Sequence, residues 1–243
     1  MTTSPTQPVV QALAPTGRLR VAVWTLPFFA VPRGATLIGM IPELAAELAS
    51  RLGVPLDFMG YAVPAVLVEG FRRGAADVTF VGMTAERAEV IDFGPVIFYL
   101  ETSYLVPASS ALAGIADVDR PGVRIVVPGR SAQEAHLRKT IRYATLIPVP
   151  PHNHKEATNL LEAGAAEAIS HVAPMLAWAQ SSLPGSRILP GSYFNVPIAI
   201  GVAKGRPAVV AEYVRAFVED VKASGFLQQA VDRAGVRGIV VAR

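Results

Sequence analysis

Residues 42–61 read PELAAELASRLGVPLDFMGY and hold a helix followed by a strand. Leucine recurs every four residues in the first half, a proline stands in the first turn, and Gly53 follows the last leucine. This pattern predicts a helix over Pro42–Leu52 that buries one face and stops at the glycine. The short apolar run that follows predicts a strand over Leu56–Tyr61.

The same alternation extends to both sides of this stretch. An apolar run at Leu19–Trp24 predicts a strand before the helix. After Tyr61, a helix is predicted over Pro64–Arg73 and a buried strand over Asp77–Gly82. Strands that alternate with helices in this way favour an α/β fold with a mostly parallel sheet flanked by helices.

A second block of the same kind occupies the second half of the chain. It comprises predicted strands over Val123–Val127, Leu146–Val149 and Ala168–His171 and predicted helices over Ser131–Ile141, Lys155–Ala163 and Pro174–Gln180. The chain then continues with a predicted strand, Ile198–Ala203, and its longest predicted helix, Pro207–Ser224. Two such blocks in 243 residues predict two sheet-based lobes.

The composition excludes several classes of function. Apolar residues make up 51% of the chain and charged residues 17%, so the chain can bury a sizeable core. The absence of cysteine excludes disulfides, thiolate chemistry and cysteine-based zinc sites. The net charge of +3 is spread along the sequence, which argues against nucleic acid as a partner.

The N-terminal residues predict neither a folded element nor a targeting segment. Residues 1–16 are rich in threonine, glutamine and proline, and we expect them to form a flexible arm. They carry no basic segment and no long apolar stretch, so they do not resemble a signal peptide. The longest apolar runs of the chain are short and broken by proline, and we expect no membrane insertion.

Thr84 and Arg87 are the first candidate binding residues. They follow a predicted strand directly, and Thr84 can cap a short helix whose first turn carries Arg87. Ligands of open α/β sheets bind outside the carboxyl ends of the strands, where an arginine offers a planar fork to a carboxylate. The alternative is an ordinary surface arginine, which the local pattern by itself favours.

A glycine turn and three histidines form the second group of candidates. Gly129 and Ser131 flank a turn between a strand and a capped helix, where backbone N–H groups can face an anion or simply make a βα turn. His171 ends an apolar strand and suits a cleft or a satisfied core position equally. His152 and His154 share a proline-rich loop, but no nearby ligand completes a metal site, so a solvated loop is favoured.

Two aromatic residues are further candidates for the walls of a binding site. Trp24 and Tyr61 stand at the ends of predicted strands, and each has a polar tip that needs a partner. Core packing is the alternative for both. The sequence contains no nucleophile elbow, no dinucleotide-binding glycine motif and no convincing pairing of a nucleophile with a base.

Six stretches, in order from Gly17 to about Gly235, resemble the polar-amino-acid group, family 3, of bacterial ABC-transporter solute-binding proteins. The most specific is MTAERAEVIDFGP at residues 83–95, which is similar to the family stretch T-x-E-R-x-x-x-V-D-F-S-x-P. The other five are GRLRVAV at 17–23, GMIPELAAELASRLG at 39–53, GAADVTF at 74–80, DVDRPGVRIVV at 117–127 and EAISH at 167–171.

The resemblance implies the type II periplasmic-binding-protein fold. Lobe 1 would comprise residues 17–105 and 197–243, and lobe 2 residues 106–196. Two strands, near Tyr104–Val106 and Asn195–Ile198, would form a hinge on which the lobes close around a ligand.

The resemblance also implies a binding site. Arg87 would clamp the carboxylate of the ligand with Thr84 beside it, and the turn at Gly129 and Ser131 would offer backbone donors. The site would be lined by Trp24, Tyr61, His171 and Val172. No catalytic residue, cofactor or metal is implied.

Two positions depart from the family pattern. Family members that bind amino acids place carboxylates near the first strand and after the EAISH stretch, where this chain has Trp24 and Val172. A buried ammonium group without a charged partner is costly, so we expect organic acids to bind better than common amino acids.

The expected function is capture of a small carboxylate-bearing solute, without chemistry. The resemblance implies a monomer that works with the membrane permease of an ABC transporter and a periplasmic location, although a cytoplasmic one is compatible with the sequence. One alternative is an enzyme like cyclohexadienyl or arogenate dehydratase on the same fold, for which Glu101 is the nearest acidic candidate. Another is a ligand sensor that works without a transporter.

Overall fold

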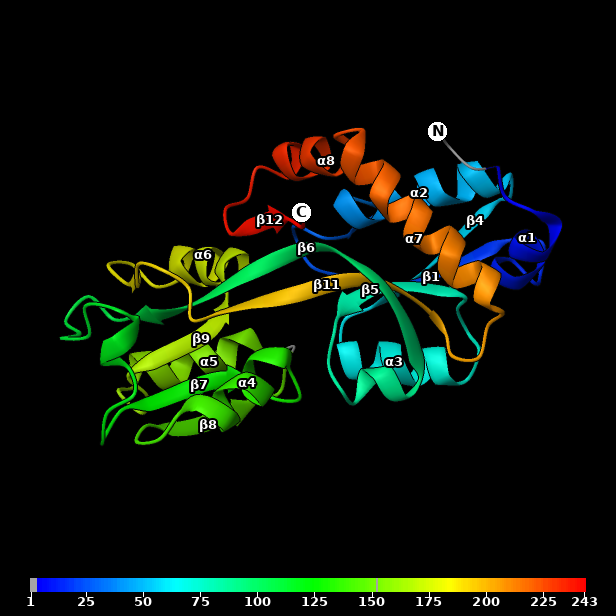
Figure 1. Cartoon of the computed structure of the whole chain (residues 1–243). Helices are drawn as coiled ribbons and strands as arrows, with labels where there is room; N and C mark the ends of the chain where they lie inside the picture. The colour runs from blue at the N-terminus through cyan, green and yellow to red at the C-terminus, as the bar shows by residue number, and fades with distance from the viewer. Residues whose placement is uncertain (1–3, 152) are drawn as a thin grey trace. The chain divides into compact units, whose positions relative to one another are not determined.

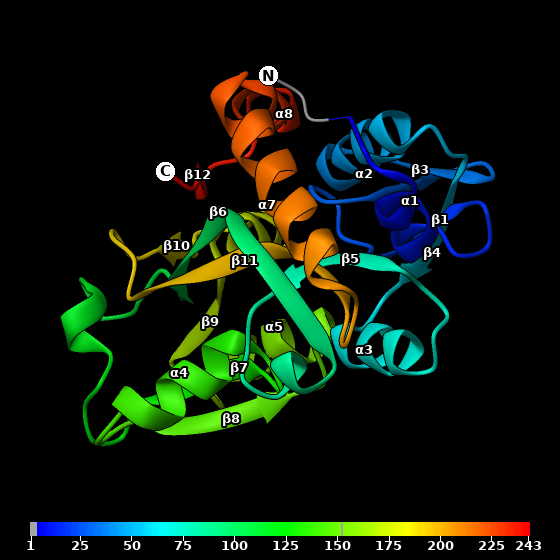
Figure 2. The same ribbon diagram turned by 45° about the vertical axis from the view of Figure 1, so that its right-hand side comes forward.

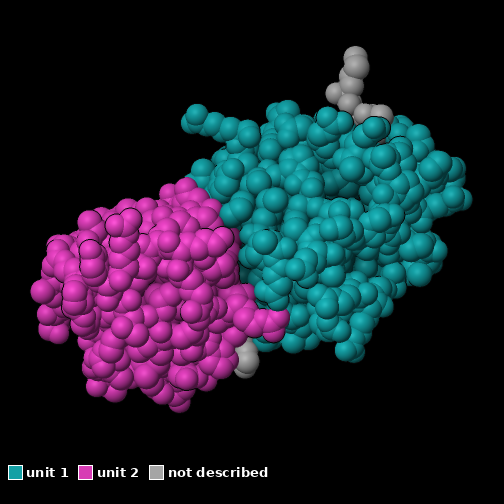
Figure 3. Space-filling model, turned by 60° about the horizontal axis from the view of Figure 1, so that its bottom comes forward, with its two compact units in different colours: residues 1–99, 197–236, 240–243 teal, residues 100–196, 237–239 magenta. Residues whose placement is uncertain are grey.

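The computed structural model describes residues 4–151 and 153–243, which divide into two compact units. Unit 1 comprises residues up to 99, then 197–236 and 240–243, and unit 2 comprises residues 100–196 and 237–239 (Figure 3). Strands β6 (Ile91–Val106) and β11 (Phe194–Ala203) carry the chain from one unit into the other. The first division falls inside β6, earlier than the boundary at residue 105 that the sequence suggested.

The sheet of unit 1 is built on three parallel strands. The central strand, β1 (Leu19–Trp24), pairs with β4 (Leu56–Tyr61) on one side and with β5 (Val78–Gly82) on the other. Strand β11 runs antiparallel to β5. Because β1, β4 and β5 are parallel, their carboxyl ends meet at one edge of the sheet, where the segments that follow them can share a site.

Helices cover both faces of this sheet. Figures 1 and 2 show α3 (Pro64–Arg72) on the opposite side of β5 from α2 (Met40–Leu52) and α7 (Ala208–Ala223). Helix α8 (Phe226–Ala234) packs against α2 and α7. Helix α2 ends where the sequence predicts, because Gly53 adopts the left-handed conformation at φ 68° and caps it.

Unit 2 repeats the design with its own three parallel strands. These are β7 (Arg124–Pro128), β8 (Thr145–Val149) and β9 (Ala168–Val172), with β7 in the centre and β6 antiparallel to β9. The flanking helices are α4 (Ala132–Thr140), α5 (His154–Glu162) and α6 (Ala173–Ser181).

Side-chain alternation along β7 assigns these helices to faces. Ile125 and Val127 pack in one cluster with Leu137 of α4, whereas Val126 packs in another with residues of α5 and α6. Successive residues of a strand point to opposite faces, so α4 covers one face of the sheet and α5 and α6 the other.

The sequence did not predict several short elements. They are the hairpin of β2 (Val31–Arg33) and β3 (Thr36–Ile38), strands β10 (Arg187–Ile188) and β12 (Ile239–Val241), and a single-turn 3₁₀ helix at Ile115–Asp117. The length of β6, 16 residues, was also missed. Strands of two or three residues are too short for a period-two pattern to stand out.

The N-terminal residues form a helix where we expected a flexible arm. Helix α1 (Gln7–Leu13) buries Val9 and Leu13 completely or nearly so, and it packs against α7. Arg206 donates a hydrogen bond from Nη1 to the carbonyl oxygen of Ala12. The composition of this segment is typical of a loose arm, but two apolar residues one helical turn apart are enough to dock it on the core.

We expect Val9→Ala to lower the free energy of unfolding by about 1.5–2 kcal/mol. The change removes two buried carbon groups, each contributing about 0.8 kcal/mol, with a small addition for the cavity. Gln11 is exposed on the same helix, so Gln11→Ala should change stability by less than about 0.5 kcal/mol. Urea denaturation of both variants checks the docking of α1, which equal values for the two would contradict.

Candidate functional site

Arg87 is buried at the carboxyl end of β5. Only 8% of its surface is exposed, and its Nη1 donates a hydrogen bond of 2.7 Å to the carbonyl oxygen of Gly82. Thr84 accepts a hydrogen bond from the Arg87 backbone N–H at 3.2 Å, as the sequence predicts for a cap, although the helix is a single 3₁₀ turn at Arg87–Glu89. The Arg87 guanidinium is therefore held by the backbone of its own segment.

Trp24 and Tyr61 lie side by side on the same edge of the unit 1 sheet, paired in the β1–β4 register. The Trp24 indole N–H donates to the carbonyl oxygen of Ala62 at 3.2 Å. The Tyr61 ring packs against α3, where a Cβ at Gly70 would stand 2.5 Å from the phenol oxygen. Both rings also contact the apolar cluster under α3, so the structure gives them a packing role beside the Arg87 segment.

The turn of unit 2 is formed as the sequence predicts, but one of its donors is occupied. Ser131 caps α4 and accepts a hydrogen bond from the Glu134 N–H at 3.0 Å. The buried Glu134 carboxylate in turn accepts from the Arg130 N–H at 2.5 Å and pairs with Arg138 at 2.6 Å. The sequence left two interpretations of the turn after Gly129 open, an anion site or an ordinary βα turn, and in the structure the Glu134 carboxylate itself accepts the Arg130 N–H.

Arg130 is the one residue other than glycine with a positive φ angle, 55°, among the residues described. A side chain in this left-handed region carries backbone strain, which persists only where the surroundings hold it. The Glu134 carboxylate supplies that restraint by accepting the N–H of Arg130.

His171 and Val172 follow one another on β9 and so point to opposite faces of the sheet. His171 lies on the face of α5 and α6, together with Ile169, and is 6% exposed. Its Nδ1 accepts a hydrogen bond from the Val172 N–H at 2.8 Å. Burial, with a smaller contribution from the nearby His154 ring, lowers the pKa of His171 to about 3, so the imidazole is neutral at physiological pH.

We expect His171 to make stability depend on pH. The folded pKa is depressed, so below about pH 6.5 the unfolded chain binds a proton that the folded protein does not, and stability falls until about pH 3. Between pH 6.5 and 5.5 the loss is about 1 kcal/mol, because the unfolded histidine is already half-protonated at pH 6.5. Urea denaturation at pH 7 and 5.5 should show this extra loss in the natural protein and not in His171→Gln. Parallel pH profiles would contradict it.

Metal binding finds no support in the described residues. No group of three or more histidine, aspartate or glutamate side chains there is arranged to hold a metal ion. His152, one of the two loop histidines that the sequence raised, lies outside the described residues. In the same part of the chain, no helix is long and apolar enough to cross a membrane.

The chain folds into two α/β units that two strands link, and in each unit three parallel strands end at one edge of the sheet. This is the two-lobed architecture of solute-binding proteins. A family model described as bacterial extracellular solute-binding proteins, family 3, matches residues 19–235. The chain belongs to this family. No curated protein sequence matches it significantly.

Solved structures share the fold. An ancestral amino-acid-binding protein, a precursor of cyclohexadienyl dehydratase, is 19% identical with a TM-score of 0.74, covering 92% of this chain and 97% of that one. An amino-acid ABC-transporter substrate-binding protein from Streptococcus pneumoniae, bound to L-arginine, is 22% identical with a TM-score of 0.73 and the same coverage. The GluR0 ligand-binding core from Nostoc punctiforme, in complex with L-glutamate, is 21% identical with a TM-score of 0.70, covering 88% and 98%. At these identities the likeness shows the type II periplasmic-binding-protein fold alone.

Proposed function

We propose that the protein captures a small carboxylate-bearing solute in the periplasm and delivers it to the permease of an ABC transporter, without chemical change. The observation that carries the proposal is Arg87, a buried guanidinium held in place at the carboxyl end of β5 in a chain of this family. A preorganised arginine binds a carboxylate with two parallel charge-assisted hydrogen bonds and loses little side-chain entropy in doing so.

The preferred solute is an organic acid without an ammonium group. Trp24 and Val172 stand at the two positions where the family resemblance led us to expect carboxylates, and Val172 is only 2% exposed. The buried carboxylate of Glu134 is already paired with Arg138. An ammonium group brought into such surroundings would lose its hydration without gaining a charged partner.

A thermal-shift panel tests the proposal with benzoate and succinate on one side and L-arginine and L-glutamate on the other. A solute at a hundred times its dissociation constant stabilises the protein by about 2.7 kcal/mol. For a chain of this size that is about 5–11 °C. A large shift with an amino acid and none with either organic acid would overturn the preference, and no shift with any carboxylate would overturn the proposed function.

Prephenate turnover separates the proposal from the enzymatic alternative. Glu101, the acidic residue that the sequence raised for this role, is half-buried on β6, and its N–H donates to the Gly238 carbonyl oxygen at 2.9 Å. We expect no conversion of prephenate at protein concentrations that give full binding of a solute. Conversion that is lost in Glu101→Gln would establish a dehydratase instead.

A further inference from the structure

Trp24 is the last residue of β1 and is half-buried at the carboxyl end of the unit 1 sheet. Its indole N–H donates to the carbonyl oxygen of Ala62 at 3.2 Å, which fixes the orientation of the ring. The Phe29 ring lies 6.4 Å from the indole, centroid to centroid, and makes edge-to-face contacts with the buried rings of Phe28 and Phe98. The indole is therefore a fixed aromatic surface, and part of it is open to solvent.

The strand register places Trp24 next to the segment that holds Arg87. In the parallel pairing of β1 with β5, Trp24 lies one residue past the last paired position, and Gly82 lies two residues past it. The carbonyl oxygen of Gly82 accepts the hydrogen bond from the Arg87 guanidinium at 2.7 Å. Since neighbouring strands of a sheet lie about 4.8 Å apart, the indole and the guanidinium lie at the same edge of one sheet, within unit 1.

Trp24 and the Arg87 turn also border the same apolar cluster. Val90, the residue after the single turn that carries Arg87, packs with Trp24 against the cluster between the sheet and α3. A solute carboxylate bound by Arg87 can therefore have its organic part beside the indole without leaving this side of unit 1.

An aromatic ring gains more on such a surface than an aliphatic ring of similar size. Two aromatic rings in an offset-stacked or edge-to-face arrangement attract each other beyond the effect of the area they bury, which corresponds to about two- to tenfold in a dissociation constant. Burial of apolar area by itself has the opposite preference, because a saturated ring carries more apolar surface than an aromatic one. The two effects can therefore be told apart by experiment.

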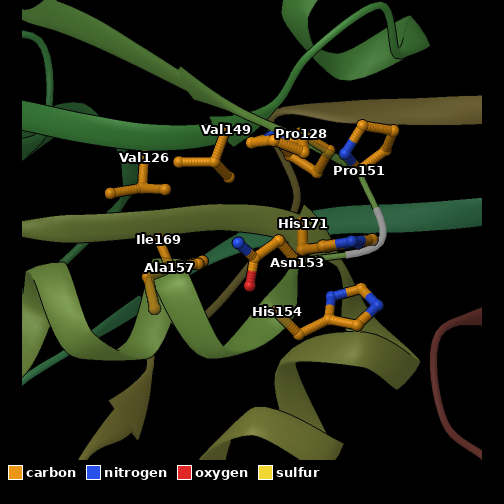
Figure 4. A pocket seen from close by; sticks show the side chains of 10 residues that line it. Val126, Pro128, Val149, Pro151, Asn153, His154, Ala157, Ile169 and His171 are labelled. Carbon is orange, nitrogen blue, oxygen red and sulfur yellow. The ribbon is translucent and has the colours of Figure 1, made fainter.

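The small pocket of unit 2 beside His171 gives no comparable place for a ring. It is lined mostly by apolar side chains from β7, β8, β9 and the start of α5 (Figure 4). Its volume of about 10 Å³ suits one water-sized atom, which is much less than a six-membered ring needs. The exposed part of the Trp24 indole is the better match for the organic part of a solute.

We propose that the solute is an aromatic carboxylate, whose ring packs against the Trp24 indole while Arg87 binds its carboxylate. This inference rests on the proposed function and deepens it, since it narrows the solute from any organic acid to one with an aromatic ring. Trp24 stands where the family resemblance led us to expect a carboxylate. At that position the chain offers a partner for a ring in place of a partner for an ammonium group.

Benzoate and cyclohexanecarboxylate are matched probes, because each has one carboxylate on a six-membered ring and only benzoate is aromatic. Calorimetric titration of the full chain should show benzoate bound about fivefold more tightly than cyclohexanecarboxylate. In Trp24→Leu, which keeps an apolar side chain, this ratio should fall to about one or below. In Trp24→Phe, which keeps a ring, it should stay above about twofold. Thermal melting of the ligand-free variants shows whether they are folded.

Tryptophan fluorescence gives a second measurement that does not need a variant at Trp24. The chain has two tryptophans, and the other, Trp178, is 45% exposed on α6 of unit 2. Trp178→Leu leaves Trp24 as the single tryptophan and should bind both acids like the natural protein. Saturation with benzoate should change the emission of Trp24 more than saturation with cyclohexanecarboxylate, because only an aromatic ring pairs with the indole.

The outcomes separate the aromatic preference from the proposed function. Tighter binding of cyclohexanecarboxylate, or the same ratio in Trp24→Leu as in the natural protein, would overturn the preference and leave the proposed function standing. Unchanged Trp24 emission at saturating benzoate would overturn it as well, whether or not Trp24→Leu folds. If the natural protein binds succinate and neither ring acid, only the aromatic preference falls. If it binds no carboxylate, the proposed function and the preference fall together.

Discussion

Replacing Arg87 with alanine is expected to weaken binding of a carboxylate solute by about thirtyfold or more. The buried guanidinium is held by the Gly82 carbonyl oxygen, and its backbone N–H by Thr84, so it can form two charge-assisted hydrogen bonds without reorganising. Removing one partner of a buried hydrogen-bonded charge pair costs about 2–5 kcal/mol. Thirtyfold corresponds to about 2 kcal/mol, the lower end of that range.

Calorimetric titration with benzoate measures the loss of affinity in Arg87→Ala. Two further variants show whether the loss comes from the guanidinium group at this position. Arg87→Lys should recover little of the affinity, because an ammonium group lacks the planar fork. Arg73 is an exposed arginine paired with Glu69 on the surface, so Arg73→Ala should bind normally. Normal binding by a folded Arg87→Ala protein would show that the solute carboxylate lies elsewhere.

The largest expected effect on stability comes from Asp77, whose carboxylate is completely buried. It accepts hydrogen bonds from the Arg20 side chain at 2.9 Å, from the Arg20 backbone N–H, and from Arg206 at 3.1 Å. Arg206 also donates to the Ala12 carbonyl oxygen of α1. One carboxylate thus joins β1, the start of β5, the segment before α7 and the N-terminal helix.

We expect Asp77→Ala to lower the free energy of unfolding by about 3 kcal/mol. Breaking a buried ion pair costs about 3–5 kcal/mol, and the lower value applies because the two guanidinium side chains keep 27% and 21% exposure. The melting temperature should fall by about 6–12 °C. Asp57 pairs with Arg18 at the surface, so Asp57→Ala should cost less than about 1 kcal/mol. Equal losses in the two variants would contradict this account.

Much of the fold follows from local patterns. The stop of α2 at Gly53 was predictable because a glycine in the left-handed conformation ends a helix whatever surrounds it. The strand at Leu19–Trp24 was predicted with its observed bounds for a similar reason, since a run that is apolar except for Arg20 and is bounded by polar residues suits a central parallel strand.

Helix α1 could not be predicted in this way. Only Val9 and Leu13 of its residues are buried, and the surface that buries them is α7, about two hundred residues further along the chain. The Arg206 side chain that binds the Ala12 carbonyl oxygen is equally remote in sequence. Contacts between distant segments depend on the packed fold, and local composition does not encode them.

For the candidate site, the sequence by itself determined which residues follow the strands. Thr84 and Arg87 follow β5, Ser131 caps α4, and His171 ends an apolar strand, because turn, cap and strand signals act over a few neighbouring residues. Only the tertiary structure decided that Nε2 of His171 is buried without an acceptor among the described residues. Burial and hydrogen-bond partnership are set by whatever packs against a side chain from other segments, and those neighbours exist only once the chain has folded.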